Sequence, residues 1–215
     1  MFKSSKTEKI TVSAIFIALG TILSLIEIFS LPQGGGITLL SMLPVIIISY
    51  RYGIAWGSAS ALCYAALQML TGFKTVSGFF VGEDKMALPY ALASIFLDYI
   101  VAFGVLCLGG AFRKNGNPSV ALCLGSILAV SARYLVHIIS GAILFGTWAE
   151  WFFTDAMGGE FGAEVLSRYS GFGLSLFYSV IYNGLYMIPE IIITAISAYF
   201  IGKISAITGN KAVRN

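Results

Sequence analysis

Six long apolar segments, joined by short polar ones, fill almost the whole chain of 215 residues. They cover about residues 9–30, 37–51, 53–72, 88–112, 118–147 and 172–205. One helical crossing of a bilayer needs about 20 apolar residues, and the alternating pattern of a barrel strand is absent. The sequence therefore predicts an all-α membrane protein of six transmembrane helices, with residues 1–215 forming a single integral membrane domain.

Composition supports the same class. Hydrophobic residues make up 58% of the chain and charged residues 11%, whereas soluble domains are about 45–50% apolar and about 25% charged. The chain has no G-x-x-x-x-G-K-[ST] phosphate loop, so any uphill transport would need a separate ATPase. We expect no metal, no cofactor and no nucleic-acid partner.

Charge placement predicts the orientation. Nine of the 13 Lys and Arg residues fall on one side of the expected membrane: Lys3, Lys6, Lys9, Arg51, Arg113, Lys114, Lys203, Lys211 and Arg214. The other side receives Lys74, Lys85 and Arg168 together with Glu83, Asp84, Glu150, Asp155, Glu160 and Glu164. Because basic loops stay in the cytoplasm, both termini are expected there. The aromatic-rich loop 148–171 is expected outside, either as an interfacial segment or as a lid.

Four ionisable side chains lie well inside the spans: Asp98, Arg133, His137 and Glu190. Charges at that depth are costly and find partners in the bundle interior. Arg133 and His137 are four residues apart, so they share a helix face. We interpret Arg133 and Glu190 as structural charges, with Glu190 or a backbone carbonyl able to pair with Arg133, and we expect His137 to lie one turn nearer the outside.

Aromatic and amide groups accompany these charges. Tyr178, Tyr182 and Tyr186 form a stripe at helical spacing, and Asn183 lies beside it. A Tyr stripe can be plain packing, but an amide in the membrane needs partners. Together with Asp98, these groups could hold a small, flat, polar and possibly cationic molecule.

Four segments carry a family resemblance: "LPQGGGITLLSMLPVIIISYRYG", "SIFLDYIVAFGVLCLGGAFRK", "ARYLVHIISGAILFG" and "YSVIYNGLYMIPEIII". They resemble the thiamine-specific substrate-binding (S) subunits of energy-coupling factor (ECF) transporters, over about residues 10–205. The resemblance implies a six-helix S-component of a bacterial plasma membrane. It would capture thiamine from outside with high affinity and topple in the membrane when a coupling subunit and two ATPase subunits engage it.

The resemblance also implies site residues. The ligand-binding positions would be Asp98, Tyr99, His137, Tyr178, Asn183, Tyr64, Phe145, Gly35 and Trp148. The segment Gln33–Gly36 would be a mobile gate, with a plain turn as the equal alternative. The A-x-x-x-A pattern of Ala14 and Ala18 would face the coupling subunit, since small residues let helices approach closely.

The chain departs from the family pattern at two positions. The acid at Asp98 is usually Glu, and some members carry an aromatic residue where this chain has Gly35. Trp148, Trp151 or Phe152 could supply that ring. A pyrimidine precursor or another flat heterocycle is the alternative ligand.

Two other function classes compete. A stand-alone secondary carrier could use Arg133, Asp98 and Glu190 as a proton or ion relay, although no internal repeat of the kind common in carriers is visible. An intramembrane enzyme could use His137 with Asp98, or Ser140, but H-E-x-x-H and G-x-S-x-G are both missing.

Overall fold

The long helices run side by side in a computed structural model of the chain, which describes residues 5–32, 34–82 and 85–208. The first half comprises α1 (Lys6–Ser24), β1 (Glu27–Ser30), β2 (Gly36–Thr38), α2 (Leu43–Tyr52), α3 (Ile54–Thr71) and α4 (Phe73–Gly78). A broken helix follows, formed by α5 (Leu88–Ser94), the π-helix η1 (Ile95–Val101), α6 (Ala102–Gly104) and the 3₁₀-helix η2 (Val105–Gly110). The rest comprises α7 (Pro118–Leu144), η3 (Gly146–Trp148), α8 (Ala149–Trp151), the π-helix η4 (Phe152–Ala156), α9 (Gly159–Arg168), α10 (Gly171–Ile201) and α11 (Ser205–Thr208).

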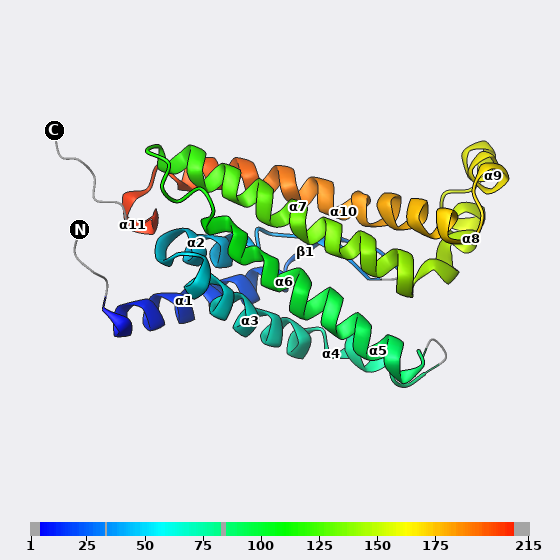
Figure 1. Cartoon of the computed structure of the whole chain (residues 1–215), viewed down its shortest axis with the longest axis horizontal. Coiled ribbons are helices and arrows are strands. Elements are labelled where there is room, and N and C mark those ends of the chain that lie inside the picture. The colour runs from blue at the N-terminus through cyan, green and yellow to red at the C-terminus, as the bar shows by residue number, and fades with distance from the viewer. Residues whose placement is uncertain (1–4, 33, 83–84, 209–215) are drawn as a thin grey trace.

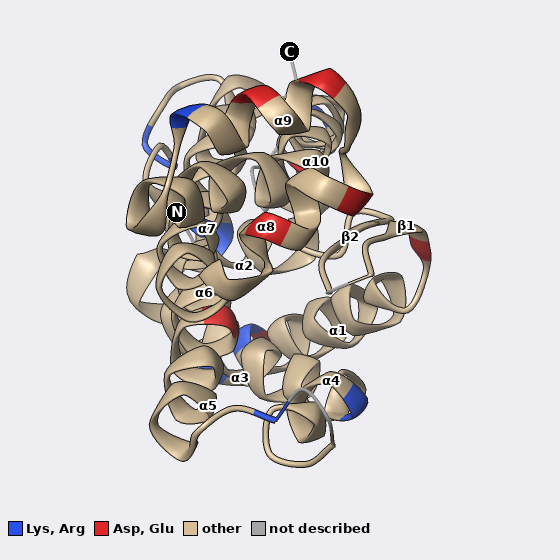
Figure 2. Ribbon diagram, turned by 90° about the vertical axis from the view of Figure 1, so that its right-hand side faces the viewer, with Lys and Arg blue, Asp and Glu red and all other residues tan. Residues whose placement is uncertain are grey.

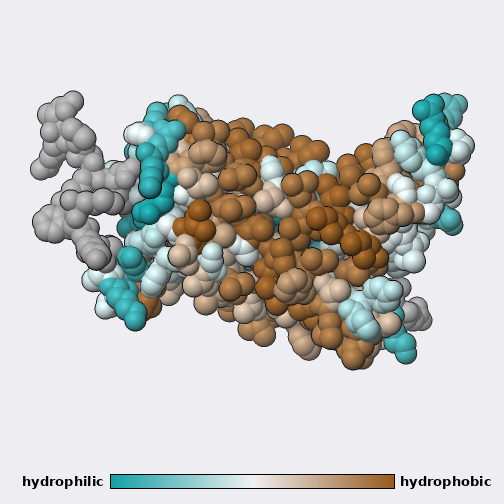
Figure 3. Space-filling model, viewed as in Figure 1, coloured by the Kyte–Doolittle hydropathy of each residue, from teal (hydrophilic) through white to brown (hydrophobic). Residues whose placement is uncertain are grey.

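Four helical segments are long and apolar enough to cross a membrane: α1, the broken helix Leu88–Gly110, α7 and α10. Apolar side chains form a broad belt around the middle of the molecule, with polar residues at both ends (Figure 3). The exposed apolar surface is what a lipid-facing bundle requires, because lipid replaces water there. The predicted membrane protein is confirmed at this level.

The first two predicted spans are partly wrong. The segment expected to be helical over about 9–30 ends at Ser24 and continues into β1, and the segment over about 37–51 starts as β2. The two strands pair antiparallel, with Phe29 opposite Ile37. The reason is local, since the glycines at 34 and 35 adopt positive φ and turn the chain back on itself.

The helix α2 lies at the centre of the bundle. Eight of its ten residues are buried, from Leu43 to Tyr50. A helix that is apolar all round belongs in the interior, and α2 packs against α1, α3, η2 and α7. Its Ser49 hydroxyl donates to the carbonyl of Cys107, which joins α2 to the broken helix.

Prolines and caps set the helix starts. Pro44, Pro89 and Pro118 each lie in the first turn of a helix, where a missing N–H costs nothing. The Asn117 side chain caps α7 by accepting from the amides of Ser119 and Val120. Pro189, by contrast, lies inside α10.

The two ends of the molecule differ in charge. The start of α1 lies at the same end as α11, and α8 and α9 lie at the opposite end (Figure 1). Acidic residues, red in Figure 2, gather on α8 and α9. Five of the residues used to predict orientation, Lys3, Glu83, Asp84, Lys211 and Arg214, lie outside the described residues.

The backbones of α7 and η2 lie close together at Gly125. A Cβ at Gly125 would lie 2.2 Å from the carbonyl oxygen of Gly109. Gly125→Ala should therefore force the segments apart and lower the free energy of unfolding by about 1–3 kcal/mol. The measurement is thermal unfolding of the purified protein in detergent.

Gly173→Ala is the control, because no heavy atom lies within 4 Å of a Cβ at Gly173. It should leave the unfolding midpoint unchanged or slightly raised, since Ala favours the helix. Equal midpoints for both variants would contradict the close contact at Gly125.

Candidate functional site

A partly buried carboxylate joins the broken helix to α7. Asp98 Oδ1 lies 3.0 Å from His137 Nδ1, and the Ser140 hydroxyl donates to Asp98 Oδ2 over 2.7 Å. His137 and Ser140 are three residues apart on α7, so one helix face supplies both partners. Asp98 lies in the π-helix η1, an irregularity that occurs frequently at functional sites.

Arg133 extends this contact into a chain. Its Nε donates to His137 Nε2 over 3.1 Å. Because an arginine N–H can only donate, Nε2 must accept, and the proton of the neutral imidazole is assigned to Nδ1, which donates to Asp98. The imidazole therefore lies between a guanidinium and a carboxylate of opposite charge.

The hydrogen-bond partner of Arg133 differs from the two that the sequence suggested. Within the described part of the chain it donates to His137, rather than to Glu190 or a backbone carbonyl, and its guanidinium carbon lies 4.0 Å from the centre of the Phe103 ring. Arg133 and His137 are thus one connected group rather than two independent ones. Phe103, which the sequence reasoning missed, lies four residues after Tyr99 and so on the same helix face.

Asn183 connects α10 to the same site. Its Nδ2 donates to the carbonyls of Ser179 and His137, over 2.9 and 3.3 Å, and its Oδ1 accepts from the Tyr186 hydroxyl over 2.7 Å. The amide is therefore satisfied by protein groups, as the membrane interior requires. The helices approach closely because α7 has a glycine there, since a Cβ at Gly141 would lie 2.2 Å from Ser179 Oγ.

The turn between the strands lies against the tyrosine stripe. The Tyr182 hydroxyl donates to the Gly34 carbonyl over 3.1 Å. Gly35 has φ +85°, and a Cβ there would lie 2.5 Å from Tyr186 Cε1. The first residue of the proposed gate, Gln33, lies outside the described residues.

Aromatic side chains of the 148–171 segment cover the N-terminal part of the stripe. The Phe152 ring centre lies 5.3 Å from that of Tyr178 and 5.6 Å from that of Tyr182. Trp148 contacts Trp151 edge-on at 5.8 Å. The segment therefore folds as short helices whose buried aromatic residues pack on α10.

Three other expected site residues lie in packing positions. Tyr64 is fully buried, donates to the Ser41 carbonyl over 3.2 Å and packs edge-on against Phe103. Tyr99 is half-buried next to Phe103, with ring centres 6.3 Å apart. Phe145 lies next to Phe79, with ring centres 6.2 Å apart.

Comparison with known proteins decides the family. The family model described as "Thiamine transporter protein (Thia_YuaJ)" matches residues 10–151. The chain belongs to this family. A relative, the thiamine transporter ThiT of Bacillus subtilis (strain 168), is 29% identical in an alignment of 208 residues that covers 91% of each chain. A solved structure titled as ThiT of Listeria monocytogenes has a TM-score of 0.65 at 21% identity, covers 92% of this chain and 94% of its own, and shows the same fold.

Family membership settles the class of protein. It is a multi-pass protein of the cell membrane and a transporter, not an enzyme. The intramembrane enzyme built on His137, Asp98 or Ser140 is therefore rejected. The resemblance noted in the sequence is confirmed.

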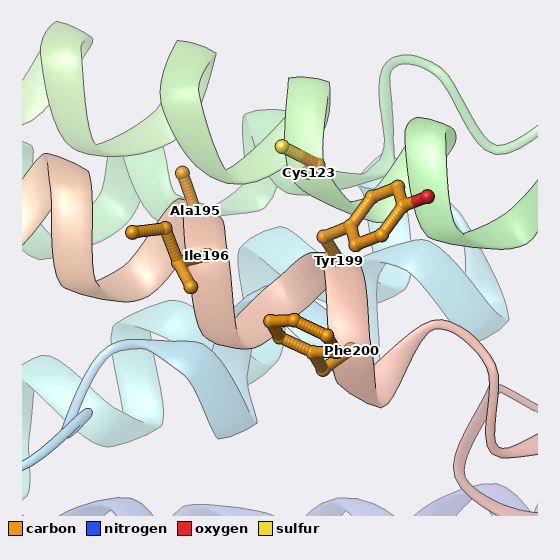
Figure 4. A pocket seen from close by; sticks show the side chains of 5 residues that line it. All are labelled: Cys123, Ala195, Ile196, Tyr199 and Phe200. Carbon is orange, nitrogen blue, oxygen red and sulfur yellow. The ribbon is translucent and has the colours of Figure 1, made fainter.

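Two hollows lie away from Asp98. One, of about 460 Å³, lies between α1 and α3; its lining includes Ala14, Ala18, Trp56 and Cys63. The other, of about 290 Å³, lies between α7 and α10 and is lined by Cys123, Ala195, Ile196, Tyr199 and Phe200 (Figure 4). The two alanines of the predicted docking pattern thus share one apolar hollow.

The glycine turn gives the second prediction. Gly35→Ala should displace the turn from Tyr186, because the added Cβ meets a buried ring as well as a positive φ that costs about 1–2 kcal/mol. The Leu31 amide donates to the Gly35 carbonyl over 2.8 Å. Its hydrogen exchange in the ligand-free protein should therefore become faster.

Gly34→Ala is the matched variant. Gly34 also has positive φ, +90°, but no heavy atom lies within 4 Å of a Cβ there. It should accelerate exchange less than Gly35→Ala does. Identical exchange in the two variants would show that Tyr186 does not hold the turn.

Proposed function

We propose that this protein is the substrate-binding subunit of an ECF-type importer and that it captures thiamine from outside the cell. The observation that carries the proposal is the hydrogen-bonded Arg133–His137–Asp98 chain, centred on the buried His137, next to Asn183 and the tyrosines of α10, in a member of the thiamine transporter family. The proposed ligand contacts are Asp98, Tyr99, His137, Tyr178 and Asn183, with Tyr64, Phe145, Gly35 and Trp148 as more peripheral positions.

The chemistry of Asp98 suits this ligand. Thiamine combines an aminopyrimidine with a cationic thiazolium ring. A carboxylate has about four acceptor sites, and His137 and Ser140 occupy two. The Asp98 side chain keeps 18% of its surface exposed, so an amine can reach the remaining acceptor sites.

We also propose six crossings with cytoplasmic termini. The four long helices and α3 account for five crossings. The remaining helix, α2, has ten residues and is about 15 Å long, so it needs the adjoining strand segment to complete a crossing. The basic residues of α1, α2 and the segment after α10 support a cytoplasmic location for the end where the chain starts.

Energy would come from partner subunits. No phosphate loop is present in the sequence, so the proposed partners are a coupling subunit and two ATPase subunits. The hollow lined by Ala14 and Ala18 is the proposed docking face, because small residues permit close helix contact.

A stand-alone carrier is the second candidate, favoured by the hydrogen-bonded charge chain. The proposed relay of Arg133, Asp98 and Glu190 is not continuous, however, because Glu190 contacts Thr38 instead. Uptake of thiamine into vesicles that contain this protein alone would favour the carrier. Uptake that requires the ATPase subunits would favour the importer.

Calorimetric titration of the purified protein with thiamine tests the proposed function. We expect saturable binding at a stoichiometry of one. Absence of binding at micromolar ligand would overturn it, and binding of a pyrimidine precursor in place of thiamine would reassign the ligand.

The third prediction concerns the Asp98 charge. Asp98→Asn keeps the shape and one acceptor oxygen but removes the negative charge. A lost hydrogen bond to a charged group costs about 1.5–3 kcal/mol, so the thiamine Kd should rise by about tenfold or more. Calorimetry at constant pH and salt measures it.

Glu164→Gln is the matched carboxylate-to-amide control. Glu164 lies exposed on α9 and pairs with Arg168 over 2.6 Å. Its Kd should equal that of the unaltered protein, because exposed pairs contribute little. An unchanged Kd for Asp98→Asn would remove Asp98 from the site.

A further inference from the structure

Glu190 connects α10 to β2, 152 residues away in the sequence. Its Oε1 accepts from the Thr38 amide over 2.6 Å and from the Thr38 hydroxyl over 2.8 Å. The residue is 2% exposed and lies in the interior of α10. Its other oxygen, Oε2, is buried without a hydrogen-bond partner among the described residues. Both hydrogen bonds from Thr38 are therefore accepted by the same oxygen of the Glu190 side chain.

The contact belongs to a series along one face of α10. Tyr182, Tyr186 and Glu190 are spaced four residues apart, so they share that face. They contact, in order, the Gly34 carbonyl, Gly35 and Thr38. One helix face thus contacts this segment at both of its ends, while β1 pairs with residues 36–38.

The contacts with α10 at the two ends of this series, Gly34 and Thr38, differ in their hydrogen bonding. At Thr38 one buried oxygen of Glu190 accepts two hydrogen bonds, from the Thr38 amide and from the Thr38 hydroxyl. The Thr38 hydroxyl donates to Glu190, so it accepts from Ser41 Oγ at 2.6 Å, which links the contact to the start of α2. At Gly34 the carbonyl accepts from the neutral hydroxyl of Tyr182. The Thr38 end is therefore the fixed end of the segment.

We propose that Glu190 is a positioning residue that anchors the 34–38 segment over the tyrosines and thereby slows ligand release. The proposal rests on the proposed function, in which the ligand lies next to Tyr186 and His137. Glu190 does not touch the ligand. It holds Thr38 in place, so that opening is confined to the glycines at 34 and 35.

Hydrogen exchange in the ligand-free protein tests the anchor without reference to any ligand. Glu190→Ala should accelerate exchange of the Thr38 amide by tenfold or more, because that amide loses its acceptor. Thr194→Val is the matched control, since Thr194 lies one turn further along α10 and its buried hydroxyl has no partner among the described residues. It should leave the exchange of Thr38 unchanged. Equal exchange in Glu190→Ala and the unaltered protein would overturn the proposal.

Release kinetics test the consequence. In stopped-flow chase with unlabelled thiamine, Glu190→Ala should release ligand about tenfold faster or more, with a smaller change in the association rate. Glu190→Gln keeps an acceptor oxygen for Thr38 and should give an intermediate rate, whereas Thr194→Val should match the unaltered protein. Release from Glu190→Gln as fast as from Glu190→Ala would show that the acceptor oxygen is not the anchor.

A variant on the Thr38 side of the contact keeps the test possible if Glu190→Ala does not fold. Thr38→Val removes the hydroxyl but keeps the amide, so it should raise release by a few-fold, and its effect should not add to that of Glu190→Ala. Additive effects would overturn the direct contact. If the unaltered protein binds no thiamine, the proposed function fails, and the exchange experiment still decides whether Glu190 anchors the segment.

Discussion

A carboxylate inside a bilayer has no water to solvate it, and the organisation of this site follows from that constraint on Asp98. The bilayer interior penalises an unpartnered charge by several kcal/mol. Asp98 therefore draws two residues of α7 to the broken helix, and His137 in turn orients Arg133. Through the His137 carbonyl, Asn183 brings α10 to the same place. The broken helix, α7 and α10 thus meet at the site around the Asp98 carboxylate.

Much of this could be predicted from the sequence, because helical periodicity and bilayer thickness are local rules. The bounds of α7 and α10, the shared face of Arg133 and His137, and the placement of Asn183 beside the tyrosines follow from such rules. The family was also recognisable from the sequence.

Contacts between distant segments could not be predicted in this way. Periodicity gives the face on which Glu190 lies, but not that Thr38, 152 residues away, lies opposite it. The strand pair was missed because a hydropathy pattern does not separate a short strand from the end of an apolar helix. The contact of Phe103 with Arg133 depends on the packing of two helices, which no single helix encodes.

The π-helix η1 determines what the loss of one residue from the broken helix would do to the site. Its wider turns hold one residue more than a regular helix would, within the segment that carries Asp98 and Tyr99. Because each residue of a wider turn rotates the chain by less than the roughly 100° of an α-helix, the turn takes up its extra residue with little rotation between its two flanks. Deleting one residue between Ile95 and Val101 would therefore leave α5 and η2 close to their present orientation. The side chains within the turn would shift instead, Asp98 among them, so a change of length here would move the carboxylate away from its partners on α7 while the rest of the bundle stayed in place.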